Sequence, residues 1–494
     1  MSSAQIRWRH FWGERRQKMA SDYEKFLWKE TESEDLSQRA HAYWHLAEYS
    51  LHSTEYNVAL GLNETAQENY TKAGDAEGMA MTRIQHARIL AALGEYDQAI
   101  EELEACSLEE RANPSQTKLA EIISIEGHVY LEKNDVDRAI DCFRQSIELY
   151  KSEDEYDETL RVSVQLSTLL RDHDRAHEAF EIIEGAKEAA LQDDDARSQA
   201  EYEFERGQVL TEIGRRDEAI EALEGAASSF EFLDMKPRSQ MTRARLAHAY
   251  NRFGEYGKAI EFSKANSEDL VRHSRTIAGA AKLRLDYSYE SAYAHSRLGN
   301  FEKAKKICKE SINVARTLGR KGVQVRFLKL QGWMAEQEFE LETAERVYLE
   351  AIEVNRHRDA NRKSRALKLS LAGIYIEAQR GRETIDLLET FDIYQWGKAD
   401  LEKRQTYFTL LMHAYWYVGN SENAATLAKV VLENQLIEGV SSPSACAAHN
   451  MLSVVYENWN QLEKAREHGL KALAMAIEFG NQPLAQDLSK RWLA

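Results

Sequence analysis

The chain has 494 residues and a formal net charge of −18, from 64 Lys and Arg against 82 Asp and Glu. Because a protein with this negative charge repels a phosphate backbone, we expect no direct nucleic-acid partner and favour protein partners of basic character. No apolar stretch reaches the length of about 18 residues that a membrane-spanning helix requires.

The first predicted element is an amphipathic helix within residues 1–35. Trp8, Trp12, Met19, Tyr23 and Phe26 recur at helical spacing, and five Arg or Lys side chains lie between positions 7 and 18. These charges are incompatible with the apolar segment of a secretory signal. We favour a cap on the open end of the elements that follow, and the alternatives are a docking arm for a partner or a contact with an acidic membrane surface.

Residues 36–480 repeat a pattern anchored on one small residue. The anchors are Ala59, Ala99, Ala139, Ala179, Ala219, Ala259, Ala304, Ala344, Ile385, Ala424 and Ala465. Most intervals are 40 residues or within one of 40, and one is 45. Twelve positions before the anchor stands Ala, Gly or Ser in every repeat but the tenth, where Met412 takes its place. Small residues at fixed spacing let two helices approach closely, so the pattern predicts stacked helix pairs.

A short turn phrase precedes the anchors, as in GEYDQAI ending at Ile100 and GEYGKAI ending at Ile260. Together with the small-residue pattern, this phrase resembles the tetratricopeptide repeat family. The 40-residue period is similar to the long variety in Pins/LGN-type scaffolds, kinesin light chains and Rap-type or MalT-type regulators. The resemblance implies an all-α, right-handed superhelical solenoid of about eleven helix pairs, with the first helices lining an inner groove.

Two departures from the period are candidates for function. Five residues are inserted within 264–284, and the ninth repeat has Ile385 as its anchor. Insertions in solenoids tend to gather on binding edges. After the last repeat, Leu484, Leu488 and Trp492 recur every four residues, which predicts a closing helix over residues 481–494.

Motifs of enzyme chemistry are missing from the sequence. It has no phosphate-binding loop, no H-E-x-x-H, no C-x-x-C and no G-x-S-x-G. We therefore expect no catalytic site and no cofactor. The four cysteines have no close pair, which suggests small buried residues in a protein of the reducing cytoplasm.

The sharpest metal candidate is the group His41, His45, Glu48 and His52. Offsets of four, seven and eleven place these side chains on one stripe of a helix, where neighbouring pairs could chelate a cation such as zinc. Four ligands on one straight helix do not close a tetrahedron, so we favour a polar wall without metal.

If first helices line the groove, as the resemblance implies, the middle repeats place aromatic, acidic and Arg side chains on its wall. Such side chains are typical of peptide-binding hot spots. The candidate partner-binding residues are Phe204, Glu205, Arg245, His248, Arg252, Asp286, Tyr289, Glu290, Tyr293 and Arg297. We therefore expect a non-enzymatic scaffold or adaptor that binds a partner segment in this groove. A peptide-responsive or small-ligand-responsive regulator of the Rap or MalT type, and a structural subunit of an enzyme complex, are the alternatives.

Overall fold

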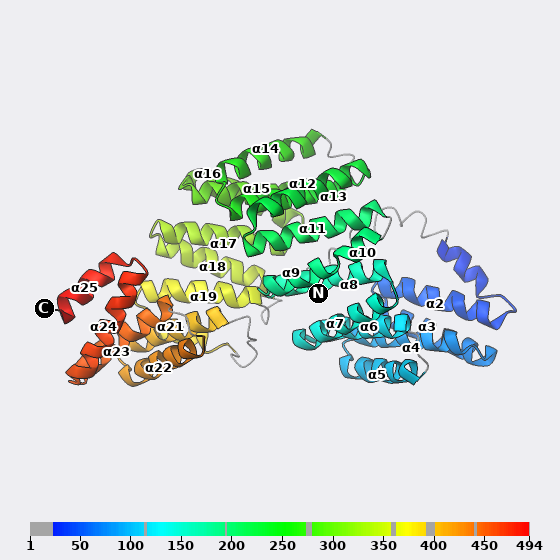
Figure 1. Cartoon of the computed structure of the whole chain (residues 1–494), viewed down its shortest axis with the longest axis horizontal. Coiled ribbons are helices and arrows are strands. Elements are labelled where there is room, and N and C mark those ends of the chain that lie inside the picture. The colour runs from blue at the N-terminus through cyan, green and yellow to red at the C-terminus, as the bar shows by residue number, and fades with distance from the viewer. Residues whose placement is uncertain are drawn as a thin grey trace. The chain divides into compact units, whose positions relative to one another are not determined.

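The computed structural model describes residues 23–112, 116–192, 195–272, 279–356, 362–391, 401–438 and 442–493 (Figure 1). In these ranges the chain forms helices and turns without a strand. The all-α fold class predicted from the sequence is therefore confirmed.

The helices alternate between a first and a second helix of each repeat. The first helices are α2 (Leu36–His52), α4 (Ala76–Leu93), α6 (Gln116–Lys133), α8 (Tyr156–Asp172), α11 (Ala196–Ile213), α13 (Lys236–Arg252), α15 (Ala280–Arg297), α17 (Lys321–Gln337), α19 (Arg362–Glu377), α21 (Leu401–Tyr417) and α23 (Pro443–Asn458). The second helices are α3 (Tyr56–Ala73), α5 (Tyr96–Ala112), α7 (Val136–Ser152), α9 (Ala176–Gly185) with its continuation α10 (Lys187–Gln192), α12 (Arg216–Phe232), α14 (Tyr256–Arg272), α16 (Phe301–Thr317), α18 (Leu341–Val354), α20 (Gly381–Leu388), α22 (Ser421–Glu438) and α24 (Leu462–Glu478).

Local chemistry fixes where several of these helices begin and end. The Asp75 carboxylate accepts a hydrogen bond from the Gly78 backbone N at 2.9 Å, which caps the start of α4. Gly94 follows α4 in the left-handed conformation, at φ 92°, where a side chain would be strained. Such caps end each helix after a similar number of turns. The repeat in the sequence therefore gives a regular repeat of helix pairs in the structure.

The small-residue pattern is the packing core of each helix pair. The ten alanine anchors are fully buried, and Ile385, the one larger anchor, is 8% exposed. A Cβ atom added to Gly207 would lie 2.7 Å from Leu223 Cγ, and one added to Gly332 would lie 2.7 Å from Tyr348 Cζ. Helix pairs therefore approach closely enough at these positions that a side chain has no room.

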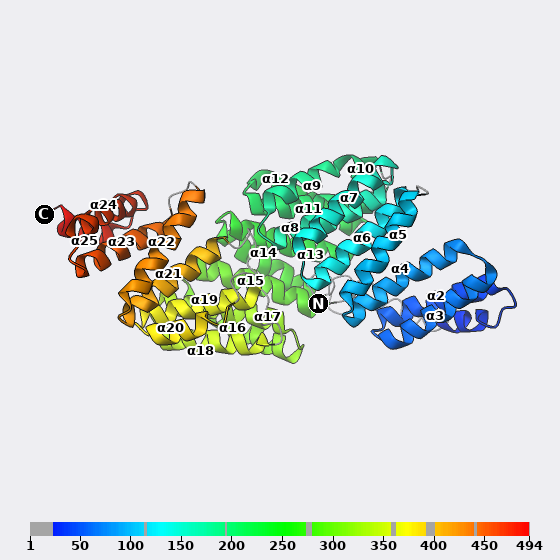
Figure 2. The same ribbon diagram turned by 90° about the horizontal axis from the view of Figure 1, so that it is seen from below.

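Two compact units divide the chain, Met1–Asp234 and Met235–Ala494, and each is described here by itself. Within each unit, successive helix pairs stack in chain order (Figure 2). First helices of neighbouring repeats contact one another, as α2 does α4 and as α13 does α15, whereas second helices in the described ranges make no comparably extensive contact. The closer spacing of the first helices puts them on the inner side of the curve in each unit.

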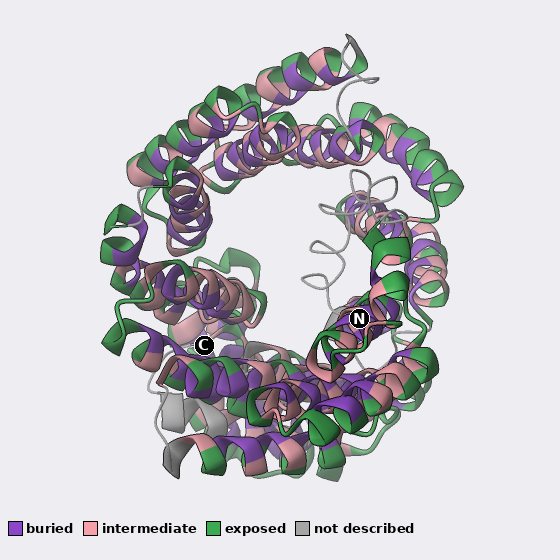
Figure 3. Ribbon diagram, turned by 90° about the vertical axis from the view of Figure 1, so that its right-hand side faces the viewer, coloured by how far each residue is buried: buried purple, intermediate pink, exposed green. Residues whose placement is uncertain are grey.

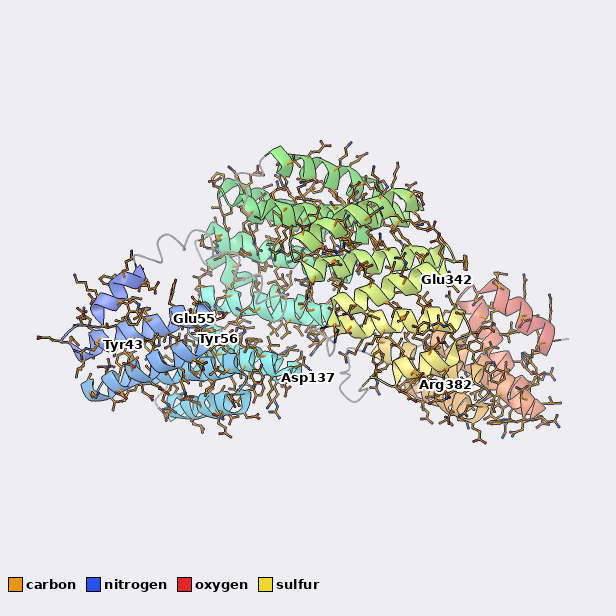
Figure 4. The ribbon with its side chains drawn as sticks, turned by 180° about the vertical axis from the view of Figure 1, so that it is seen from behind. Tyr43, Glu55, Tyr56, Asp137, Glu342 and Arg382 are labelled. Carbon is orange, nitrogen blue, oxygen red and sulfur yellow. The ribbon has the colours of Figure 1, made fainter. Side chains whose placement is uncertain are left out.

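Burial follows the same layering. In Figure 3 the buried residues lie on the faces that helices turn toward their neighbours, and exposed residues lie on the opposite faces. Glu342 on α18 and Arg382 on α20, which are labelled in Figure 4, both belong to second helices.

All four cysteines are buried and unpaired, as the sequence led us to expect.

Some predicted segments fall partly outside the described residues. These are 1–22, with Trp8, Trp12 and Met19, residues 273–278 of the insertion, and residues 392–400 after the ninth repeat. Of the predicted amphipathic helix, residues 23–30 are helical, with Leu27 buried and Tyr23 and Phe26 about half exposed. The predicted closing segment contains α25 (Gln482–Trp492), whose Leu488 is buried against Ala472 and Leu473. The division into an N-terminal helix, repeats over 36–480 and a closing helix stays a prediction.

Candidate binding surface on the first helices

Three consecutive first helices of the second unit, α13, α15 and α17, carry most of the predicted site. We call their inner-layer side chains the basic–aromatic band. Its members are Arg245, His248 and Arg252 on α13, Asp286, Tyr289, Glu290, Tyr293 and Arg297 on α15, and Arg326, Lys329 and Trp333 on α17. Eight of the ten predicted residues belong to this band, and α17 adds three that were not predicted.

Glu290 is the buried centre of the band, at 4% exposed. His248 Nδ1 lies 3.3 Å from Glu290 Oε1, and Asn251 Nδ2 donates to Glu290 Oε2 at 2.9 Å and to the Glu290 backbone oxygen at 2.9 Å. Burial raises the pKa of Glu290, but His248, Arg326 and Asn251 outweigh it and the pKa is lowered. A charged Glu290 therefore joins α13 to α15.

Arg326 continues this network from α17. Its guanidinium lies over the ring of Tyr289, 4.0 Å from the ring centroid, and contacts Asp286 Oδ1 at 3.4 Å and Glu290 Oε1 at 3.7 Å. Tyr289 is half-buried and packs edge-on against Phe327, with ring centroids 5.4 Å apart. The cation over its face and the packing at its edge fix the orientation of Tyr289.

The outer part of the band is more accessible. Tyr293 and Trp333 are half-buried, and Arg297 is exposed. Arg297 lies 5.6 Å from the centroid of the Trp333 ring, and its Nε donates to the Tyr256 hydroxyl at 3.5 Å. Trp333 also packs edge-on against Phe301. A rigid aromatic surface beside an exposed guanidinium is suited to bind an extended segment.

The other two predicted residues, Phe204 and Glu205, belong to α11 in the first unit and are 5% and 2% exposed. Arg171 Nε and Nη2 donate to the two Glu205 oxygens at 2.9 and 3.0 Å, and Ser167 and Gln208 each donate at 2.9 Å. Glu205 therefore holds α8 to α11, whereas Phe204 packs edge-on against Phe230 of α12, with ring centroids 6.4 Å apart. Together with Glu290, they are too buried to contact a partner, and we do not carry them into the proposed binding surface.

The missed residues Arg326, Lys329 and Trp333 stand 18, 15 and 11 positions before the anchor Ala344. Asp286, Tyr289 and Tyr293 stand at the same three offsets before the anchor Ala304. The sequence of the eighth repeat therefore carries the same signal as that of the seventh.

The histidine group on α2 does not assemble as a metal site. His41 Nε2 and His45 Nε2 lie 3.0 Å apart, but Glu48 is bound by the Arg88 guanidinium at 2.7 and 2.9 Å. Burial alone would raise the pKa of Glu48, but hydrogen bonds from His52 and Arg88 lower it overall. Across the described ranges, no three His, Cys, Asp or Glu side chains are placed to hold a metal ion.

The sequence pattern of the tetratricopeptide repeat family matches this chain over residues 120–153 and 285–317. The chain contains tetratricopeptide repeats. The first match covers most of α6 and α7, and the second covers most of α15 and α16 and so includes the centre of the band. No curated protein sequence matches the chain.

Among solved structures, the fold is similar to that of a signal-transduction ATPase from Pyrococcus horikoshii that carries a tetratricopeptide repeat sensor. The TM-score is 0.51 at 14% identity, over 88% of this chain and 74% of that one. The apo form of RapI gives 0.49 at 11% identity, over 77% and 98% of the two chains. A putative kinesin light chain from Podosopora anserina gives 0.35 at 18% identity, over 41% and 99%.

The match to the tetratricopeptide repeat family supports an interaction or regulatory repeat protein. In the described part of the chain, no helix is both long and apolar enough to cross a membrane.

Proposed function

We propose that this chain is a non-enzymatic adaptor that binds an extended segment of a protein partner along the basic–aromatic band. The observation that carries the proposal is the cluster of Tyr293, Trp333 and Arg297, which presents two half-buried rings and an exposed guanidinium on the inner layer. Burial of such side chains in an interface is the usual source of binding energy in protein recognition.

The band is held in place before any partner arrives. Glu290 links α13 to α15, and Arg326 links α15 to α17. Because these helices are fixed by buried charges, little conformational entropy is lost when a segment docks. Because the accessible rings and the guanidinium are oriented before binding, we favour a binding role over a purely structural one.

The expected partner chemistry and compartment complete the proposal. The net charge of the whole chain favours basic partners, but the local charge of the band differs from it and decides what docks there. Four buried, unpaired cysteines suit a reducing compartment such as the cytoplasm. The described residues offer no observation that favours the regulator or the enzyme-subunit alternative.

The test is a selection of displayed random peptides of about 12 residues on the immobilised full-length chain, since such peptides can cross three neighbouring helices. Peptides enriched by the native chain are then measured by fluorescence polarisation against the double variant Tyr293→Ala, Trp333→Ala. We expect affinity to fall about thirtyfold or more, since a true hot-spot aromatic contributes about 2 kcal/mol or more.

The matched control is Val314→Ala with Leu349→Ala, two truncations of half-exposed apolar side chains on the second helices α16 and α18. This variant should bind as the native chain does. Circular dichroism and a melting curve establish that both variants are folded. Enriched peptides that bind the aromatic double variant and the native chain equally well would place the site elsewhere and refute the proposal.

A further inference from the structure

The first helices of the second unit carry a charge opposite to that of the protein. Lys and Arg outnumber Asp and Glu by five to none on α13, three to two on α15 and three to one on α17. Their second-helix partners α14, α16 and α18 together carry nine Lys and Arg against nine Asp and Glu, although α16 alone carries five against two. Summed over the three repeats, the excess of positive charge therefore lies in the layer that carries the band.

The first unit does not share this excess. Its first helices α2, α4, α6, α8 and α11 together carry nine Lys and Arg against twelve Asp and Glu. The repeat fold therefore does not require basic first helices, because first helices with an acidic excess pack in the same way in the first unit. A feature that the fold does not need calls for a functional reason.

The acidic residues of the three helices are already engaged. Asp286 and Glu290 contact Arg326, and the Glu336 carboxylate accepts a hydrogen bond from the buried Tyr348 hydroxyl. Arg297, in contrast, contacts a hydroxyl and an indole ring and not a carboxylate, as far as the structure describes the chain. Positive charge is left over at the accessible part of the band.

Lys329 adds to this surplus. Its side chain is exposed, yet the surrounding protein and the ammonium group of Lys403 on α21 lower its pKa, against a smaller opposing effect of Glu336. A carboxylate bound beside the exposed Lys329 would favour its charged form. Lys329 and Arg297 therefore lie where an anionic group would be stabilised.

We propose that the segment bound along the band is acidic, an Asp-rich or Glu-rich stretch of a protein partner whose carboxylates face Arg297 and Lys329. This inference rests on the proposed binding function and names the chemistry of its occupant. The aromatic side chains Tyr293 and Trp333 bind apolar side chains interspersed among the acids. The occupant is thus opposite in charge to the partner that the composition of the whole chain suggested.

A peptide fits this surface better than a nucleic acid does. A polynucleotide extends its regular charge well beyond three helices and meets the field of a protein with net charge −18. A short acidic segment meets the local positive charge and leaves the remaining surface untouched.

The experiment uses the peptides selected on the full-length chain. We expect enriched sequences to carry an excess of Asp and Glu, and substitution of those residues by Asn and Gln to weaken binding about tenfold or more. The charge-reversal variant Arg297→Glu, Lys329→Glu should lose affinity to a similar degree, with a weaker dependence on salt than the native chain. Lys306→Glu with Lys309→Glu, two exposed lysines on α16, is the matched control and should leave binding unchanged.

Each alternative outcome has a definite meaning. Peptides that require Tyr293 and Trp333 but are neutral or basic would overturn the acidic assignment and leave the adaptor function standing. Binding that depends on neither pair would overturn both. A labelled single-stranded oligonucleotide of about 12 nucleotides that binds more tightly than the selected acidic peptides would show that the band recognises nucleic acid, against this inference.

Discussion

Gly207 tests whether helix separation in this array is set by the small-residue positions. It lies in α11, and a Cβ atom placed on it would stand 2.7 Å from Leu223 Cγ, 3.0 Å from Leu223 Cδ2 and 3.2 Å from the Leu223 backbone N. The substitution Gly207→Ala therefore forces α12 away from α11, because the crowded atoms include the branch point of a side chain and the backbone itself.

Two opposing terms decide the effect on stability. Alanine favours a helix over glycine by about 1 kcal/mol. Overpacking of a well-packed core costs about 1 to 3 kcal/mol, and here the upper part of that range applies because a backbone atom must move. We expect a net loss of about 1 to 2 kcal/mol in the free energy of unfolding.

Gly225 on α12 provides the control, because a Cβ atom there meets nothing within 4 Å. Gly225→Ala should raise stability by about 0.5 to 1 kcal/mol. Urea denaturation followed by circular dichroism compares the variants, and amide hydrogen exchange in α11 and α12 locates the effect, because repeat arrays often unfold in parts. If Gly207→Ala stabilised the chain as much as Gly225→Ala, close packing at the small positions would not set helix separation.

Two further predictions concern polar groups that are buried or half-buried. Glu205→Ala leaves the Arg171 guanidinium without its carboxylate, so the free energy of unfolding measured in urea should fall by about 3 to 5 kcal/mol. The same substitution at the exposed Glu221 should be nearly neutral. Equal effects of the two substitutions would contradict the role given to the Arg171–Glu205 pair. His449 on α23 and His468 on α24 have their Nδ1 atoms 2.8 Å apart, and burial and the charge of His468 lower the pKa of His449 to about 4. The pKa of His449 in the folded state lies below the unfolded value of about 6.5. The contribution of neutral His449 to the free energy of unfolding is therefore complete above pH 6.5 and is lost as the pH falls toward 4. Melting temperatures of the native chain and His449→Gln across this range should converge at low pH, and a constant difference would refute the assignment.

The fold was predictable because backbone packing imposes a strict period on the sequence. A residue such as Ala219 must be small wherever two helices cross closely, and the crossing recurs once in each repeat. The turn phrase before each anchor supplies the second signal. The division after Asp234 was not foreseen, because no Gly-rich, Ser-rich or Pro-rich linker marks it.

The sequence predicted which helix positions belong to the candidate site, but it did not predict which of their side chains are exposed. Glu205 and Glu290 are buried although a carboxylate side chain is usually exposed, whereas the apolar side chain of Phe204 is buried as such side chains commonly are. Whether a carboxylate is buried depends on a partner in the preceding repeat, such as Arg171 for Glu205, 34 residues earlier in the chain. Side-chain pairing across repeats is decided in three dimensions, so a single repeat does not reveal it.

One register relation connects these buried acids and explains how the array builds a rigid inner layer. Glu205 and Glu290 both stand 14 positions before their anchors, and the donors Arg171 and Asn251 both stand 8 positions before the anchors of the preceding repeats. The same pair of positions therefore joins neighbouring first helices in each unit, by an ion pair in one and a hydrogen bond in the other. Because a buried acid held in this way cannot turn outward, the residues beside it on the helix face set the charge of the inner surface. In the first unit these are mostly acidic and neutral residues, whereas in the second Arg297 lies on the same helix as Glu290, and Lys329 lies on the next first helix, α17. A common structural device thus supports two inner surfaces of different charge, and only the second is suited to an acidic segment.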